Sequence, residues 1–188
     1  VRLSRPLNLP DAMPEADVLR LLKAYADDDK TDMPLFRGAG AYRHFIPPII
    51  GALTQRGEFL TAYTPYQFEM SQGMLQAIYE FQSLIARLTG LDASNASVYD
   101  GATAAAEAML MCRDSARKQK FLAPQGLHPD VPEVLRTYAP CVSIELVDIP
   151  LKDGVTDLAA VSVNLEGAAG LIAAPPTYLG LPDNTAAL

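Results

Sequence analysis

Residues 120–149 read KFLAPQGLHPDVPEVLRTYAPCVSIELVDI, and this stretch carries the main fold signal of the chain. It opens on an apolar run, Lys120–Pro124, which predicts a short strand. A segment with helical spacing follows, from near Pro129 to Tyr138, and the run Val142–Ile149 predicts a second strand. Because short apolar runs that alternate with helical segments are typical of crossover connections, the stretch predicts a parallel α/β sheet.

The alternation continues toward the end of the chain. Lys152–Gly154 is a turn signal, the segment near Leu158–Asn164 predicts a helix, and Ala168–Ala174 predicts another strand. The sequence shows no internal repeat and no low-complexity linker. We therefore expect one α/β unit with a mostly parallel sheet and crossover helices.

Two longer helices are predicted before this unit. Gly73–Thr89 has apolar residues on one face and Gly90 in the position of a C-terminal cap. The next, Thr103–Lys118, is rich in alanine and can be capped by Asp100. Between them, Asn95–Tyr99 is a candidate for a short strand.

The first part of the chain differs in character. Pro14–Ala26 predicts a helix, with proline and acidic residues in its first turn. From Met33 to Gly73 the pattern is irregular and rich in glycine, proline and tyrosine. Long polar and aromatic loops of this kind are usually functional or disordered, and the tyrosines favour a packed, functional arm.

Composition excludes several classes of protein. The 188 residues are 49% hydrophobic and carry a net charge of −7, which disfavours binding to nucleic acid. No apolar run approaches the length of a membrane-spanning helix, so we expect no membrane partner. Cys112 and Cys141 have no metal-ligand spacing, so we expect no metal site. The opening residues do not resemble a secretory leader, and we expect a cytoplasmic protein.

Few residues point to chemistry by pattern alone. The two histidines, His44 and His128, fit loop contacts or packing as well as catalysis, and no Gly-x-Ser-x-Gly motif supports a nucleophile. Gly38–Gly40 lacks the strand and the third glycine of a dinucleotide site. The turn Asp100–Thr103 starts a helix, so it can bind a phosphate or simply cap that helix.

Ordered motifs nevertheless run almost from end to end, and with them the sequence resembles the P-protein of the glycine cleavage system, glycine dehydrogenase (decarboxylating). The resemblance is to the first of the two subunits into which many prokaryotes split this enzyme. The motifs are Gly38-Ala39-Gly40-Ala41-Tyr42, Phe45-Ile46-Pro47, Tyr63-Thr64-Pro65-Tyr66-Gln67 with Glu69, Ser71-Gln72-Gly73, Asn95-Ala96-Ser97, Asp100-Gly101-Ala102-Thr103-Ala104, Lys152-Asp153-Gly154-Val155-Thr156 and Pro176-Thr177-Tyr178-Leu179-Gly180.

The resemblance implies a PLP-dependent transferase-like architecture of fold type I and a reaction. Glycine forms an aldimine with PLP, the ring accepts electrons while CO2 leaves, and the aminomethyl group passes to the lipoyl arm of the H-protein. In the split enzyme a lysine of the second subunit holds PLP, and the first subunit completes the site of that partner. The lysines of this chain fit this division, because none lies in a Ser/Thr-x-His-Lys setting; they are Lys23, Lys30, Lys118, Lys120 and Lys152.

The resemblance also points to site residues. The loop with Tyr63, Tyr66 and Gln67 is expected to reach a partner's cofactor or substrate, although packing at an interface would equally explain the tyrosines. Glu69 can orient an amine or, as we favour, pair with an arginine. The turn Asp100, Gly101, Ala102 and Thr103 is expected to be a vestige of a phosphate site that now caps its helix.

The expected organisation is an N-terminal helix and interface arm over residues 1–72 and part of the α/β large domain over residues 73–188. Family chains continue past Leu188, so we expect the sequence to be incomplete at its C-terminus. Two other readings stay open. The chain could be a non-catalytic structural or regulatory partner of the PLP-bearing subunit, or a stand-alone PLP enzyme with a cofactor lysine of its own.

Overall fold

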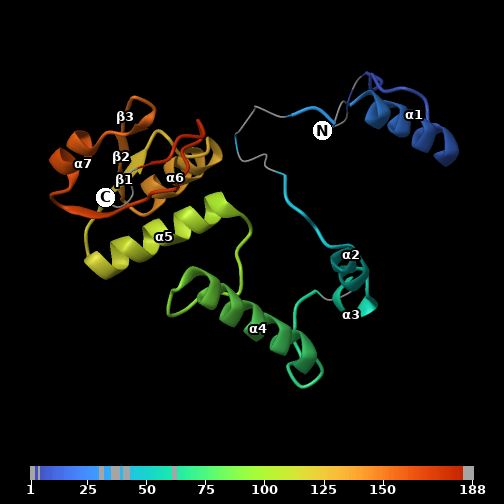
Figure 1. The fold of residues 1–188 in the computed structure, drawn as a ribbon, viewed down its shortest axis with the longest axis horizontal. Coiled ribbons are helices and arrows are strands. Elements are labelled where there is room, and N and C mark those ends of the chain that lie inside the picture. Colours follow the sequence, from blue (N-terminus) through green and yellow to red (C-terminus); the bar gives the residue numbers. More distant parts are fainter. Residues whose placement is uncertain are drawn as a thin grey trace. The chain divides into compact units, whose positions relative to one another are not determined.

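The computed structural model describes residues 3, 5–29, 32–34, 39, 43–60 and 63–183 (Figure 1). The chain divides into two compact units, Val1–Arg37 and Gly38–Leu188. The expected division into an arm over residues 1–72 and a large-domain part over residues 73–188 stays a prediction.

The first unit contains one helix, α1 (Glu15–Asp28), among its described residues. Pro14 precedes it, and the acidic residues Glu15 and Asp17 lie in its first turn, where the helix dipole favours negative charge. Asp17 pairs with Arg20 one turn later, at 2.7 Å. The predicted helix is confirmed, and it ends at Asp28, within the acidic triplet Asp27–Asp29.

The irregular segment in the second unit contains two short helices, α2 (Pro48–Thr54) and α3 (Gly57–Leu60). Pro48 occupies the first helical position of α2, where its missing N–H costs nothing. The longer helix α4 (Gln72–Thr89) follows and ends at Gly90, whose φ of 73° closes the helix in the left-handed conformation. Both the predicted helix and its glycine cap are confirmed.

The predicted strand at Asn95–Tyr99 is wrong. The backbone bends there because the Asn95 side chain accepts a hydrogen bond from the N–H of Ser97 at 3.0 Å. Ser97 itself has a φ of 90°, which no strand residue adopts. The segment leads directly into α5 (Gly101–Ala116), which Asp100 caps as predicted.

Three parallel strands form the central sheet, in the order β2-β1-β5. Their bounds are Lys120–Pro124 for β1, Glu145–Ile149 for β2 and Ala168–Leu171 for β5. Between β1 and β2 the chain forms α6 (Asp130–Cys141), and between β2 and β5 it forms α7 (Leu158–Asn164). The predicted mixed α/β fold with a small parallel sheet is confirmed.

Strand β2 begins three residues later than expected. Helix α6 continues to Cys141 despite Pro140 in its last turn, and Ser143 then turns the chain with a φ of 57°. After β2, the short strands β3 (Leu151–Lys152) and β4 (Val155–Thr156) form the predicted turn as a hairpin. Asp153 and Gly154 connect these strands, with φ of 55° and 82°. Positive φ at both connecting residues suits a tight hairpin turn.

The sheet is covered on both faces, as a parallel sheet requires. Phe121 and Ala123 of β1 pack against α5 and α6, with Met109 and Leu135 in the same cluster. The side chain between them, Leu122, points to the opposite face, where it packs with residues of β2 and α7. The alternation along β1 thus gives each face its own apolar core.

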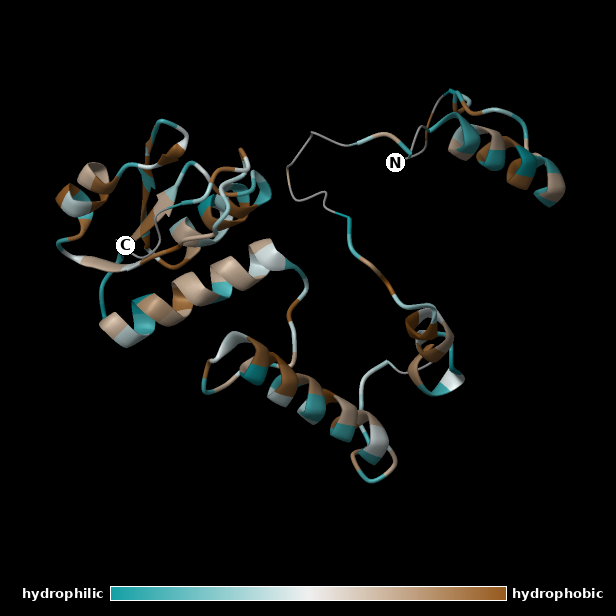
Figure 2. Ribbon diagram, viewed as in Figure 1, coloured by the Kyte–Doolittle hydropathy of each residue, from teal (hydrophilic) through white to brown (hydrophobic). Residues whose placement is uncertain are grey.

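Helices α1 to α4 contain no buried residue, whereas α5 contains four. Figure 2 shows a hydrophobic stripe along α4 beside polar residues, the pattern of an amphipathic helix. Among the described residues, no helix combines the length and the apolar character needed to span a bilayer.

Candidate functional site

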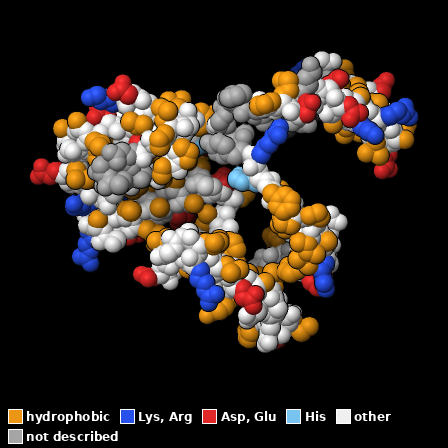
Figure 3. Space-filling model, in the orientation of Figure 1, with side chains coloured by type: hydrophobic (Ala, Val, Ile, Leu, Met, Phe, Trp, Pro, Cys, Tyr) orange, Lys and Arg blue, Asp and Glu red, His pale blue; other side chains and the backbone are white. Residues whose placement is uncertain are grey.

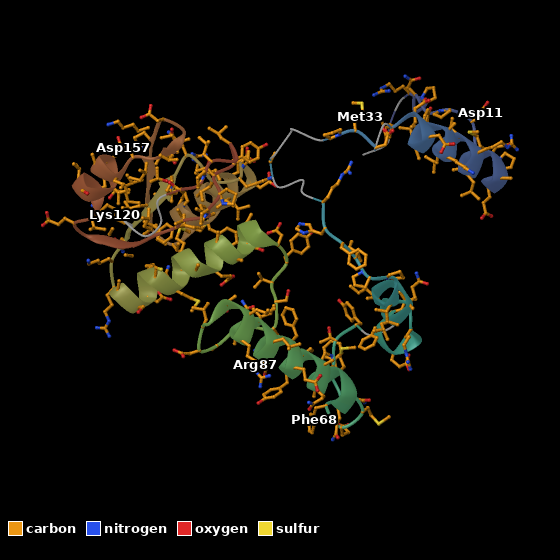
Figure 4. All side chains as sticks on the ribbon, in the orientation of Figure 1. Asp11, Met33, Phe68, Arg87, Lys120 and Asp157 are labelled. Carbon is orange, nitrogen blue, oxygen red and sulfur yellow. The ribbon has the colours of Figure 1, made fainter. Side chains whose placement is uncertain are left out.

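The loop predicted to carry the site lies between α3 and α4. Two local hydrogen bonds form turns in its backbone. The N–H of Tyr66 donates to the Thr64 carbonyl at 2.8 Å, and the N–H of Met70 donates to the Gln67 carbonyl at 3.1 Å. The side chains of Tyr63 and Tyr66 are 91% and 79% exposed, and Gln67 is also exposed. Figure 4 labels the neighbouring Phe68, which lies in the turn before α4. The loop therefore presents its polar groups outward.

A pocket of about 680 Å³ lies beside this loop. Tyr63 lines it, whereas Tyr66 and Gln67 do not, so the structure places only one of the three predicted residues in the pocket. Figure 3 shows hydrophobic side chains gathered over α2 and α3, which form one wall. The lining residues come from α2, α3, the tyrosine loop and the start of α4: Leu53, Arg56, Glu58, Phe59, Tyr63, Thr64, Pro65, Met70, Ser71, Gly73 and Met74.

The pocket contains an ion pair that the sequence analysis missed. Arg56 Nη2 lies 2.6 Å from Glu58 Oε1, and Arg56 Nε lies 3.4 Å from Glu58 Oε2. The hydrogen bond from Arg56 lowers the pKa of the Glu58 carboxyl to about 2, and the same bond raises the pKa of Arg56.

The expected pairing of Glu69 with an arginine stays a prediction. Within the described ranges, no ion pair joins Glu69 to an arginine. The glycine-rich motif at residues 38–42 lies outside the described residues except for Ala39, which has a φ of 59°.

The turn Asp100–Thr103 is closed by its own side chains. The Asp100 carboxylate accepts from the backbone N–H of Thr103 at 2.8 Å, and the Thr103 hydroxyl oxygen accepts from the N–H of Asp100 at 3.0 Å. This is a capping box, and the N–H of Thr103 lowers the pKa of the Asp100 carboxyl. Since a carboxylate already occupies the helix N-terminus, the turn does not fit a bound phosphate dianion.

The lysines that the structure describes do not lie in a setting that suits covalent PLP either. Of the four that the structure describes, none is buried. Lys120 begins β1, at the amino edge of the sheet, and its Nζ donates to the Glu166 carbonyl; Figure 4 labels it there. Lys152 lies exposed in the β3–β4 hairpin, and Lys30 lies outside the described residues.

His128 lies just beyond the carboxyl end of β1. Its ring meets that of Tyr178 edge to face, with centroids 5.3 Å apart, and its Nδ1 accepts from the N–H of Asp130 at 3.3 Å. The ring contact with Tyr178 is long-range packing and the hydrogen bond from Asp130 lies within one turn, in line with the packing alternative. His44 is exposed. In the described part of the chain, no three histidine, cysteine, aspartate or glutamate side chains are grouped as a metal site would require.

The fold and these sites together define a parallel α/β protein with a tyrosine loop and a side pocket outside its sheet. The model of the glycine cleavage system P-protein family matches residues 1–179, and the chain belongs to this family. This finding confirms the resemblance that the motifs carried.

Two similar proteins from other organisms carry the same name. The chain is 52% identical over 182 residues to "Probable glycine dehydrogenase (decarboxylating) subunit 1" of Moorella thermoacetica. The aligned region covers 96% of this chain and 40% of that protein. It is 46% identical over 185 residues to the protein of the same name in an Anaeromyxobacter species, with 97% and 42% covered.

A solved structure agrees with these relatives. It is a crystal structure of glycine decarboxylase (P-protein) of the glycine cleavage system in inhibitor-bound form, with a TM-score of 0.78 and 43% identity. The match covers 97% of this chain and 41% of that one. The sequence thus spans about 40% of the length of the relatives it matches.

Proposed function

We propose that this chain is the N-terminal part of a P-protein subunit that decarboxylates glycine with PLP and passes the aminomethyl group to the lipoyl arm of the H-protein. Membership in the family and the shared name of the relatives support the proposal. The architecture is then that of a fold-type-I PLP enzyme, with residues 1–72 as an interface arm and residues 73–188 as part of the large domain. The small parallel sheet with helices on both faces is consistent with it.

PLP is expected on a second subunit rather than on this chain. When bound there, it supplies the electron sink that lets CO2 leave glycine. Two observations support this division of labour: no described lysine is buried, and the Asp100 carboxylate fills the helix N-terminus that a phosphate would need.

The contribution of this chain is the tyrosine loop. Tyr63, Tyr66 and Gln67 offer hydroxyl and amide groups that suit the carboxylate and amine of glycine. The observation that carries the proposal is that Tyr63, 91% exposed, lies at the edge of a pocket lined by a charged pair. In a complex, these groups would complete a site that the partner subunit begins.

One observation favours a second reading, a structural or regulatory partner that never contacts glycine. Large apolar side chains are exposed on helices α2 and α4. They are Ile49 (59% exposed) and Leu53 (45%) of α2, and Phe81 (43%) and Leu84 (56%) of α4. Exposed apolar groups of this kind mark interaction surfaces. A subunit whose role is only to dock would need these residues and not the tyrosine hydroxyls.

The test is exchange of labelled CO2 into the carboxyl group of glycine with PLP and H-protein present. Three samples are assayed: the full-length subunit alone, the PLP-bearing subunit alone, and the two together. We expect exchange only in the mixture. Equal exchange by the second subunit alone would contradict a shared site, and exchange by the first subunit alone would show that it holds PLP itself.

A further inference from the structure

We propose that Arg56 binds the carboxylate of glycine in the pocket beside Tyr63 and that Glu58 is a positioning residue, which holds the guanidinium in place. This inference rests on the proposed function, because it names the residue that anchors the substrate of that same site. It assigns a role to a pair that neither the motifs nor the tyrosine loop indicated.

The backbone of Arg56 is fixed by the chain on both sides. Arg56 follows Gln55, which caps the C-terminus of α2. Its carbonyl accepts from the N–H of Phe59 at 3.0 Å and of Leu60 at 2.9 Å, so it also caps the first turn of α3. The junction between α2 and α3 thus fixes the Cα atom of Arg56 at the pocket wall.

The ion pair leaves one edge of the guanidinium available. A guanidinium has five N–H donors in a rigid planar fork. Glu58 accepts from Nε at 3.4 Å and from Nη2 at 2.6 Å, on one side of the fork. The donors of Nη1 and the second donor of Nη2 lie on the adjacent edge, where their spacing matches the two oxygens of a carboxylate.

The surroundings suit a small carboxylate that also carries polar groups. Apolar side chains line most of the pocket, so its polar groups are few. Tyr63, Thr64 and Ser71 belong to the same lining, and their hydroxyls can serve the remaining polar atoms of a ligand. The Arg56 and Glu58 side chains are 58% and 64% exposed, so a ligand can reach them. The pocket volume of about 680 Å³ exceeds what glycine alone needs, which leaves space for a group presented by a partner.

The kinetic signature of this role differs from that of a general structural role. A carboxylate that leaves as CO2 loses its charge, so the Arg56 interaction is at least as strong in the ground state as in the transition state. Its removal should raise KM for glycine and leave kcat nearly unchanged. We expect an increase in KM of about 10- to 100-fold for Arg56→Gln, since hydrogen bonds to charged groups are lost.

The experiment uses the full-length subunit assembled with the PLP-bearing subunit and H-protein. Glycine KM and kcat are measured by CO2 exchange for Arg56→Gln, Arg56→Lys and Glu58→Gln, and assembly is measured by sedimentation. Arg56→Lys keeps the charge but not the fork and should give an intermediate KM, and Glu58→Gln should raise KM less than Arg56→Gln. Acetate should compete with glycine in the unsubstituted complex and do so much more weakly in Arg56→Gln. The matched control is Arg87→Gln, on the exposed face of α4 (Figure 4), which should change none of these values.

Each outcome has one meaning. An unchanged glycine KM in Arg56→Gln, with the unsubstituted complex active, overturns this inference and leaves the proposed function standing. Weakened assembly with an unchanged glycine KM shows that Arg56 binds a carboxylate of the partner subunit, and it also overturns the inference. Absence of exchange by the unsubstituted complex overturns the proposed function itself.

Discussion

Thr156 and Asp183, 27 residues apart in the sequence, are joined by two hydrogen bonds. Asp183 Oδ1 accepts from the N–H of Thr156 at 3.0 Å, and Asp183 Oδ2 accepts from the Thr156 hydroxyl at 2.6 Å. Thr156 is 4% exposed, so its polar groups depend on this carboxylate. The contact fixes the segment after β5 against the β3–β4 hairpin, and two further bonds within that segment, between Thr177 and Leu181, shape its turn.

We predict that Thr156→Val destabilises the full-length subunit by about 1–3 kcal/mol, because it removes a charge-assisted hydrogen bond from a buried position. Thr156→Ser keeps the hydroxyl and is the matched control, with an expected loss below about 1 kcal/mol. Urea unfolding gives both free energies. Equal stability of the valine and serine variants would contradict a role for this hydroxyl.

We predict that any side chain at Gly170 in β5 lowers the stability of the protein. A Cβ atom there would lie 2.9 Å from Cys112 Sγ and 3.1 Å from a ring carbon of Phe121. Gly170→Ala should therefore cost about 1–3 kcal/mol through overpacking between α5 and the sheet. Adding Cys112→Ala should recover part of this loss, since it removes the nearest atom.

The matched control for Gly170 is Gly51 in α2, where a Cβ would meet nothing within 4 Å. Gly51→Ala should leave stability unchanged or raise it by up to about 1 kcal/mol, because alanine favours helices. Destabilisation of similar size at both positions would mean that the contact with Cys112 is not the cause.

Much of the fold was predictable because local signals agree with the tertiary structure. The bounds of β1 and α7 match the predictions, since apolar alternation and an Asp157 cap act within a few residues. The strand prediction for Asn95–Tyr99 was wrong because a hydrogen bond from the Ser97 N–H to the Asn95 side chain outweighed β propensity. The start of β2 shifted because α6 tolerated a proline in its last turn.

The candidate site was only partly predictable. The motif pointed to Tyr63, and the structure places Tyr63 at a pocket. The Arg56–Glu58 pair was not found, because a charged pair two residues apart has no sequence signature unless the turn between two short helices brings the side chains together. Closure of the Asp100 turn by the Thr103 hydroxyl likewise depends on geometry rather than on residue type alone.

We predict that Tyr63→Phe and Tyr66→Phe each reduce CO2 exchange about 10- to 100-fold in the assembled complex, because in the proposed site each tyrosine offers a hydroxyl to glycine. The matched control is Tyr79→Phe on α4, a tyrosine that is 67% exposed and outside the pocket. Assembly is measured alongside by sedimentation. Unchanged exchange in a complex that still assembles would favour the purely structural partner.

The cap of α5 should make the stability of the subunit depend on pH. The N–H of Thr103 lowers the pKa of the Asp100 carboxyl from its ordinary value of 3.8, so the charged form is favoured in the folded state. The stabilisation is therefore present above the unfolded-state pKa and is lost as pH falls through the lower, folded-state pKa. Asp100→Asn keeps an oxygen acceptor at the cap but has no charge to titrate.

The Tm of the unsubstituted subunit should therefore exceed that of Asp100→Asn at pH 7, and the difference should shrink as pH falls below about 4. Comparing the two proteins at each pH removes the effect of the other carboxylates, which titrate in both. Calorimetry from pH 7 to pH 3 measures the difference. A difference that stays constant over this range would mean that the Asp100 charge does not stabilise α5.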